Sequence, residues 1–294
     1  MTKSNNSNRS ILSAAIALSA LASFNAMAGT PTVSKEVKEV IVPEATPLFT
    51  GSVEVGYDSR YYFRGLWFAD NTTWAGVNLS VPLTQSLTLG LSALYTSTVN
   101  TDVLPSGPGS QLDYSELDLI ASLTYDLKFM KIAAVYTNYQ FFDTFSGRTD
   151  FGSFGRGEFA VLSVPEAGIV ASSSFAGLNF YGAYYYDFNI GGSYIEVGAD
   201  YPVKITEWLT IIPAVRGGYG LDYYSNGAPE NGGLSGGVTS GITHGLATIS
   251  APITITKNCT LTPYGAYNVS GRARQSNNTQ DNEMFGGVKL SVTF

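Results

Sequence analysis

The stretch VEVGYDSRYYFRGLW, residues 53–67, places apolar and charged side chains at alternating positions. Val53 and Val55 stand at odd positions, whereas Glu54 and Asp58 stand at even ones. A period of two is typical of a β-strand with one apolar face and one polar face. The stretch also exceeds the roughly five or six residues usual for a strand, so it predicts a long strand between an apolar and a polar environment.

The same alternation recurs along the rest of the chain and predicts twelve strands. No stretch of the mature chain is apolar over the roughly 20 residues that a transmembrane helix needs. Such a chain is either soluble or crosses a membrane as a closed barrel, because lipid offers no hydrogen-bond partner to an open sheet edge. The predicted strands cover residues 53–67, 74–81, 87–96, 116–125, 129–142, 166–175, 178–188, 193–205, 208–221, 236–253, 258–269 and 283–294.

The lengths of the connections between these strands separate the two possibilities. Connections after even-numbered strands are a few residues long, whereas four after odd-numbered strands are long: 98–112, 143–165, 222–235 and 270–282. Outer-membrane barrels have an even number of strands, short periplasmic turns and long outer loops, whereas a soluble sandwich does not sort its loops in this way. We therefore expect an all-β protein, a transmembrane antiparallel up-and-down β-barrel of about 12 strands. The short connection after the seventh strand is the exception.

The two ends of the chain support export to the outer membrane of a Gram-negative cell. Residues 1–28 combine a positive start, an apolar run and the A-x-A sequence Ala26-Met27-Ala28, which predicts a cleaved signal peptide rather than an anchor helix. Residues 29–49 show no barrel period and are interpreted as a periplasmic leader, with a docking peptide as the alternative. The barrel then spans 50–294. The terminal strand ends on Phe294, which resembles the signal that the barrel assembly machinery reads.

Composition and charge exclude several classes of function. Charged residues make up only 13% of the chain, against about 25% in a typical soluble protein, and the net charge is -7. An acidic chain without a basic patch does not favour nucleic acid as a partner. One His and one Cys exclude a zinc site with several such ligands, so we expect no cofactor. We also expect no enzyme, because His244 is the only imidazole and Ser240 lies about 13 Å from it along a strand.

The apolar face of the strands is expected to meet lipid, which directs the charged face into the barrel. Lys289 on the last strand can then approach Glu54 or Asp58, and Arg216 can approach Glu196 or Asp200 on the adjacent strand. Two interpretations stay open: simple neutralisation by ion pairs, or a constriction whose field selects the permeating solutes. The predicted lumen residues are Glu54, Asp58, Arg60, Arg64, Glu116, Asp118, Glu196, Asp200, Arg216 and Lys289.

The aromatic residues have two expected positions. On the outward face, rings with one polar tip suit the lipid headgroup boundary. Inward rings either fill space or form a stacking track for solutes. The outward set is Tyr57, Tyr61, Trp67, Tyr95, Tyr125, Trp208 and Tyr219, and the inward set is Tyr181, Tyr185 and Tyr264.

The segment Gly56-Tyr57-Asp58-Ser59-Arg60-Tyr61-Tyr62-Phe63-Arg64-Gly65 resembles the opening strand of the TorF-type porins, also called the Gcw_chp family. The resemblance is specific over these residues and general over the remaining strand pattern. It implies an outer-membrane barrel with a pore, and it brings no substrate and no catalytic residues. The leader before the first strand departs from the usual pattern of that family.

The expected barrel is narrow. Twelve strands about 4.8 Å apart and tilted by about 40° enclose a backbone cylinder of roughly 12 Å radius, which side chains narrow further. We therefore expect a channel for passive diffusion of small hydrophilic solutes, with outer-membrane lipid and the assembly machinery as its other partners. The alternative is a closed barrel that presents loops 98–112, 143–165 and 270–282 for adhesion or docking. The sequence favours no particular permeant or oligomeric state.

Overall fold

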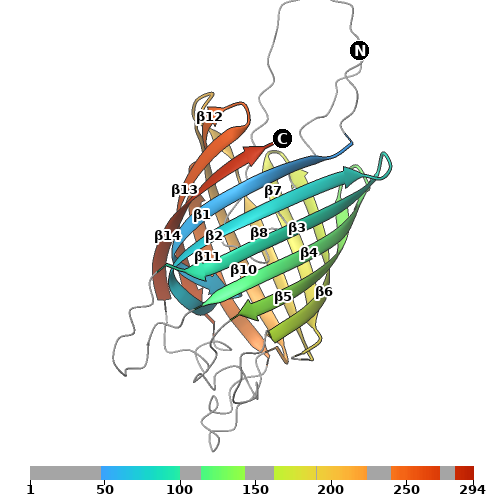
Figure 1. Ribbon diagram of the computed structural model, residues 1–294, viewed down its shortest axis with the longest axis vertical. Helices are drawn as coiled ribbons and strands as arrows, with labels where there is room; N and C mark the ends of the chain where they lie inside the picture. The colour runs from blue at the N-terminus through green and yellow to red at the C-terminus, as the bar shows by residue number, and fades with distance from the viewer. Residues whose placement is uncertain (1–47, 100–113, 143–161, 190, 224–239, 272–281) are drawn as a thin grey trace, which may run out of the picture.

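The computed structural model is a closed antiparallel β-barrel, and it describes residues 48–99, 114–142, 162–189, 191–223, 240–271 and 282–294 (Figure 1). One sheet contains fourteen strands, of which the short β9 and β12 are extensions, so that twelve strands form the ring. The all-β, twelve-stranded prediction is confirmed. The strands are β1 (Thr50–Phe63), β2 (Leu66–Pro82), β3 (Leu87–Thr98), β4 (Ser115–Asp126), β5 (Lys131–Phe142), β6 (Leu162–Phe175), β7 (Leu178–Asp187), β8 (Gly192–Asp200), β9 (Val203–Lys204), β10 (Thr210–Leu221), β11 (Gly241–Ser250), β12 (Ile253–Thr256), β13 (Cys259–Ser270) and β14 (Asn282–Thr293).

The barrel closes between its first and last strands. β1 pairs with β14 from Ser52 opposite Thr293 onward. Backbone hydrogen bonds of 2.9 and 3.0 Å link Gly51 and Phe294 in both directions, so the last residue of the chain takes part in the seam. β1 begins and β14 ends at the same end of the barrel, which we call the turn end; the opposite end is the loop end (Figure 1).

Prolines explain why two of the twelve predicted strands appear as two pieces each. The predicted strand 193–205 is β8 followed by β9, with Pro202 between them. Pro252 separates β11 from β12 in the same way, and β12 continues to Thr256, beyond the predicted end at 253. Proline has no backbone N–H and cannot donate to a sheet ladder, so it interrupts the strand without changing its course. β9 still pairs with β10, and β12 with β13.

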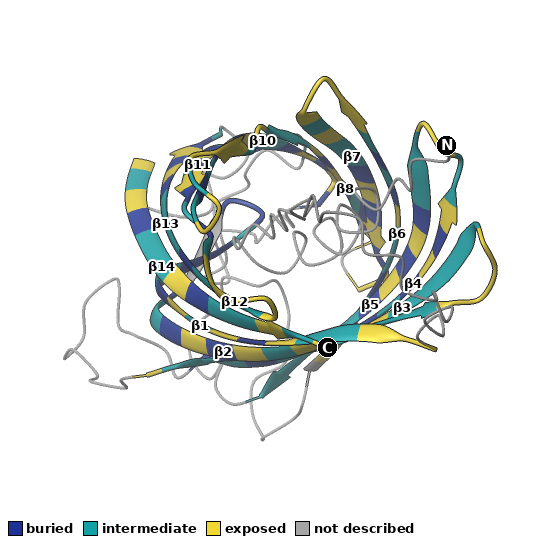
Figure 2. Cartoon of the chain, turned by 90° about the horizontal axis from the view of Figure 1, so that it is seen from above, coloured by how far each residue is buried: buried dark blue, intermediate teal, exposed yellow. Residues whose placement is uncertain are grey.

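Side chains alternate between a buried inner face and an exposed outer face along each strand, as the stripes in Figure 2 show. On β4, for example, Glu116 and Asp118 are buried whereas Leu119 and Leu123 are exposed. A wall of this kind presents apolar side chains to lipid, which is the arrangement of an outer-membrane barrel. Within the described ranges, no helix has the length and apolarity to span a membrane.

The first predicted strand is wrong in one respect, because 53–67 contains a turn. Arg64 and Gly65 have positive φ angles of 50° and 83°, and Phe63 pairs with Leu66 on either side of them. Two consecutive positive φ values are what a two-residue hairpin of type I′ requires. Trp67 therefore belongs to β2, the return strand.

Several other predictions lie outside the described residues. These are the signal peptide 1–28, all but the last residues of the leader 29–49, and most of the four long loops.

Candidate functional site: a hairpin inside the barrel

The tip of the β1–β2 hairpin separates from the neighbouring strands at the loop end. β1 pairs with β14 only as far as Asp58, and β2 pairs with β3 only as far as Thr72. The two strands nevertheless continue to pair with each other up to Phe63 and Leu66. Asn71, next to the point of separation, has a φ of 52°, which places a bend there. Residues 59–71 therefore form a two-stranded arm whose backbone is paired with the wall only at its base.

This arm points into the barrel, because its tip forms an ion pair with a strand on the far side of the ring. The guanidinium of Arg64 donates two hydrogen bonds to the carboxylate of Glu166 on β6, with N–O distances of 2.5 and 2.7 Å. Strands β3, β4 and β5 separate β2 from β6 in the ring. Both side chains are almost completely buried, with exposed fractions of 2% and 1%. A buried pair between strands so far apart spans the interior, and we call residues 59–71 the inserted hairpin.

Aromatic rings surround the same guanidinium. Its central carbon lies 4.4 Å from the ring centre of Tyr194, 4.8 Å from that of Tyr185 and 5.2 Å from that of Tyr223. The neighbouring Phe63 ring lies at 4.7 Å. These distances are within the roughly 6 Å over which a cation is attracted to an aromatic face.

Other contacts fix the remainder of the inserted hairpin against the inner wall. The Tyr62 hydroxyl donates to Glu283 over 2.7 Å, and its ring packs on Phe285 with the ring centres 5.0 Å apart. The Tyr61 hydroxyl donates to Glu116 over 3.2 Å. Tyr61 is only 1% exposed, so the prediction that it faces outward is wrong. Tyr61 keeps the odd position of the outward face, but the hairpin has left the wall at this point, so that face meets β4 from inside the barrel.

His244 lies beneath the tip of the hairpin. A Cβ atom on residue 65 would come within 2.6 Å of the His244 Cβ, so only a glycine fits at position 65. A register shift in β10 and β11 turns both Thr243 and His244 inward, and the Thr243 hydroxyl lies 3.0 Å from the His244 Nδ1 atom. Ser240 instead donates to Asp222 over 3.1 Å. The expectation that the protein is not an enzyme stays a prediction.

Two of the expected ion pairs between neighbouring strands are present on the inner wall. Lys289 Nζ lies 3.5 Å from Glu54 on the strand across the seam, and Arg216 lies 3.9 Å from Glu196. The partner of Lys289 is therefore Glu54 rather than Asp58. Asp58 accepts a hydrogen bond of 2.5 Å from the Tyr264 hydroxyl.

The remaining predicted lumen residues occupy different depths. Glu116 and Asp118 are fully buried on β4, whereas Asp200 is half-buried and accepts a hydrogen bond of 2.8 Å from Asn179. Arg60 lies at the base of the inserted hairpin, one third exposed, and pairs with Asp70 at 3.3 Å and with Glu283. Arg64 is on a turn inside the barrel rather than on its wall.

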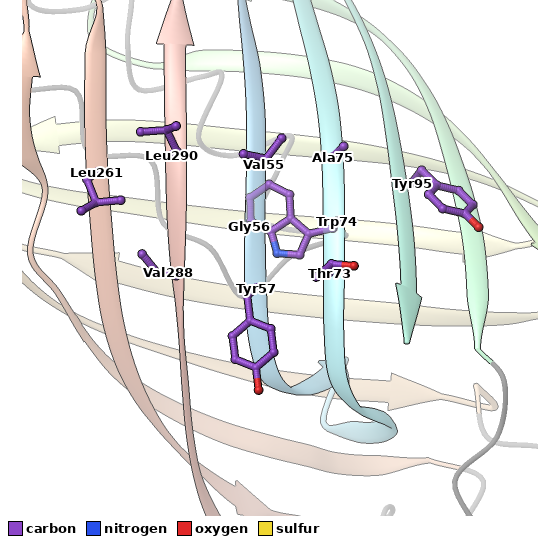
Figure 3. A pocket seen from close by; sticks show the side chains of 10 residues that line it. All are labelled: Val55, Gly56, Tyr57, Thr73, Trp74, Ala75, Tyr95, Leu261, Val288 and Leu290. Atoms are coloured by element: carbon purple, nitrogen blue, oxygen red, sulfur yellow. The ribbon is translucent and has the colours of Figure 1, made fainter. Parts of the chain in front are cut away.

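Large inward rings lie flat on the wall because glycines stand beside them. A Cβ on Gly56 would come within 2.3 Å of the Trp74 ring on β2, directly across the strand pair (Figure 3). Gly168 has the same relation to Tyr185. Glycine permits this close approach, and the ring then covers the neighbouring strand instead of crossing the lumen. The pairs of this kind are Gly56 with Trp74, Gly168 with Tyr185, Gly198 with Tyr181, Gly218 with Tyr194 and Gly287 with Tyr264.

A shallow groove of about 460 Å³ runs over the surface of the strands near Gly56 and Trp74 (Figure 3). Its lining consists mainly of outward side chains of β13, β14, β1, β2 and β3, such as Val55, Tyr57 and Tyr95, which are each more than a third exposed. An apolar groove on this face fits lipid chains rather than a hydrophilic solute.

Sequence reasoning predicted that Tyr185 faces inward but missed Glu166 and Tyr223. The predicted strand began at Glu166, whereas β6 begins at Leu162, and Tyr223 follows the end of β10. The one available signal was the Arg64-Gly65 dipeptide between two aromatic runs, which is typical of a hairpin turn. Among the described residues, no group of three or more His, Cys, Asp or Glu is arranged to hold a metal ion.

Comparison with known proteins returns solved structures of low sequence identity. No family model matches the chain, so the resemblance to TorF-type porins stays a prediction. No curated protein matches it. An outer membrane channel from Pseudomonas putida F1 is 13% identical with a TM-score of 0.48, covering 88% of this chain and 100% of that chain. LpxR from Salmonella typhimurium is 10% identical with a TM-score of 0.49, covering 83% and 100%. The translocator domain of the autotransporter NalP from Neisseria meningitidis is 12% identical with a TM-score of 0.46, covering 86% and 91%.

Proposed function

We propose that the protein is an outer-membrane channel for passive diffusion of small hydrophilic solutes, narrowed at its loop end by the inserted hairpin. The observation that carries the proposal is the inner wall. It consists of charged groups in pairs, such as Lys289 with Glu54, and of aromatic rings that lie flat over glycines. Rings that lie flat occupy less of the axis than rings that point across it, and charged groups along the wall are the kind of lining that polar channels use.

This proposal assigns a role to several of the predicted lumen charges. Glu54, Lys289, Glu196 and Arg216 line the path along the wall, and Arg64 stands in the path itself. Phe294 is proposed to serve as the assembly signal, in keeping with its place at the seam.

The second candidate is a closed barrel that presents its loops for adhesion or docking. The observation that favours it is the Arg64–Glu166 pair, because a buried bridge through the interior obstructs diffusion. The two candidates differ in whether removal of the inserted hairpin opens a path.

Single-channel conductance of refolded protein in planar bilayers tests the proposal. In one variant, residues 61–69 are replaced by Asn-Gly, which forms a two-residue turn between Arg60 and Asp70, a pair already in register. We expect the wild type to conduct weakly and the shortened variant to conduct several-fold more. If neither protein conducts, the barrel is filled and the channel proposal fails. Equal conductance in both would show that the hairpin does not narrow the path.

A further inference from the structure

The wall of the barrel holds a cage around the tip of the inserted hairpin. Five side chains form it, one each from β5, β6, β7, β8 and the segment that follows β10, and none comes from the hairpin itself. We call this group the wall cage. Its members are Tyr139, Glu166, Tyr185, Tyr194 and Tyr223.

The wall cage hydrogen-bonds both terminal nitrogens of the guanidinium group that occupies it. The Glu166 carboxylate meets two nitrogens side by side, and the Tyr223 hydroxyl accepts a third hydrogen bond of 2.6 Å from Arg64. The faces of Tyr185, Tyr194 and Tyr223 supply attraction to the delocalised charge. A planar fork against a carboxylate, enclosed by aromatic faces, is a strong and specific arrangement for a guanidinium.

Contacts within the wall hold the cage in shape independently of Arg64. The Tyr139 hydroxyl donates to Glu166 over 3.3 Å, and the Tyr194 hydroxyl donates to Glu196 over 2.9 Å. Tyr185 rests on Gly168, with no room for a side chain there. A site whose carboxylate and rings are fixed by the wall is prepared to bind a cation from solution when Arg64 leaves.

We propose that the wall cage is a binding site for small organic cations that carry a guanidinium or methylated ammonium group, and that Arg64 occupies it as an internal competitor. Aromatic faces beside a carboxylate are the groups that recognise such cations. Backbone pairing holds the inserted hairpin to the wall only at its base, so a ligand that competes for Glu166 can displace the Arg64 side chain while the contacts of Tyr61 and Tyr62 remain. The inference concerns binding and goes beyond the channel proposal, because a barrel that does not conduct can still bind the cation.

Binding of methylguanidinium to the full-length mature protein, refolded in detergent micelles, tests the inference. Tyrosine fluorescence follows the titration of wild type and Arg64→Ala. The ligand competes with Arg64 in the wild type, so we expect Arg64→Ala to bind at least about tenfold more tightly. Glu166→Gln in the Arg64→Ala background should abolish binding. Lys204→Ala, which removes one positive charge from an exposed pair outside the barrel interior, should behave as the wild type.

Neutral methylurea, which has a similar shape, serves as the ligand control and should not bind. Equal affinity of wild type and Arg64→Ala for methylguanidinium, or binding that survives Glu166→Gln, overturns the proposal. If Arg64→Ala folds only when methylguanidinium is present, that rescue supports the site. If it folds under neither condition, Arg64→Lys decides, because lysine keeps the charge but loses the fork. No gain in affinity over the wild type would then overturn the proposal.

Discussion

Two buried ion pairs in the barrel have different structural roles. Lys289 and Glu54 lie on β14 and β1, which are hydrogen-bonded neighbours near the turn end, and their charged atoms are 3.5 Å apart. Arg64 and Glu166 come from strands that are not neighbours, and they meet through two hydrogen bonds in the interior. The first pair neutralises charge on a wall that its backbone already holds. The second pair fixes the position of an arm that the backbone leaves free.

The first pair therefore bears on the stability of the wall, and the second bears on whether the lumen is open. A pair between adjacent strands can be lost while the sheet ladder keeps its register. A pair between the inserted hairpin and β6 has no ladder behind it, so its loss releases the tip of the hairpin.

Breaking the two pairs in turn gives the largest expected effect. Glu166→Ala leaves the Arg64 cation buried without its carboxylate, which is expected to cost about 3 to 5 kcal/mol in the free energy of unfolding. Glu54→Ala removes the longer contact with Lys289 and a hydrogen bond of 3.1 Å from Ser291, and it is expected to cost about 1 to 3 kcal/mol. Urea titration of both refolded variants measures the two values.

Conductance of the same variants sharpens the comparison. Glu166→Ala should also raise single-channel conductance, whereas Glu54→Ala should leave it near that of the wild type. A larger loss of stability in Glu54→Ala, or a conductance change in that variant alone, would contradict the assigned roles.

The sequence predicted those features of the wall that depend on the period of two. Glu54 and Lys289 appear at alternating positions on strands that closure makes adjacent, so their pairing follows from strand order alone. The position of the Tyr185 ring flat over Gly168 could not be predicted in this way. It depends on the register between β6 and β7, which the sequence does not specify.

The interior arrangement of the hairpin could not be predicted for a physical reason. Alternation describes a side chain relative to its own strand, and it does not say when a strand leaves the wall. The positive φ of Asn71 lies at that point, and the register shift between Tyr61 and Tyr62 follows within the hairpin. Glu166 gained its role only from the contact with Arg64 through the interior, and no local pattern in the sequence encodes a contact of that kind.

Glycine substitutions beneath aromatic rings give an effect of intermediate size. An alanine at position 168 would place its Cβ 2.3 Å from the Tyr185 ring and 2.6 Å from the Tyr184 carbonyl oxygen, and one at position 56 would lie 2.3 Å from the Trp74 ring. Both Gly168→Ala and Gly56→Ala are expected to lose about 1 to 3 kcal/mol of stability through overpacking. Only Gly168→Ala should change conductance, because Tyr185 belongs to the wall cage and Trp74 does not.

Gly265→Ala is the matched control for these two variants, since nothing lies within 4 Å of a Cβ at that position. Its stability should stay within about 0.5 kcal/mol of the wild type. If Gly56→Ala altered conductance as much as Gly168→Ala, the wall cage would not be the element that limits conductance.

Arg60→Ala gives the smallest expected effect and tests where the inserted hairpin meets the rim. Arg60 is one third exposed and is neutralised by Asp70 and Glu283, so its loss should cost no more than about 1 kcal/mol of stability. It leaves two carboxylates without their cation at the loop end, which should shift ion selectivity slightly toward cations. The reversal potential in a salt gradient measures this shift.

Because Arg64 stands in the proposed path, Arg64→Ala should produce a larger shift in the same direction. An equal or larger shift from Arg60→Ala would place the narrowest point at the rim rather than at the wall cage.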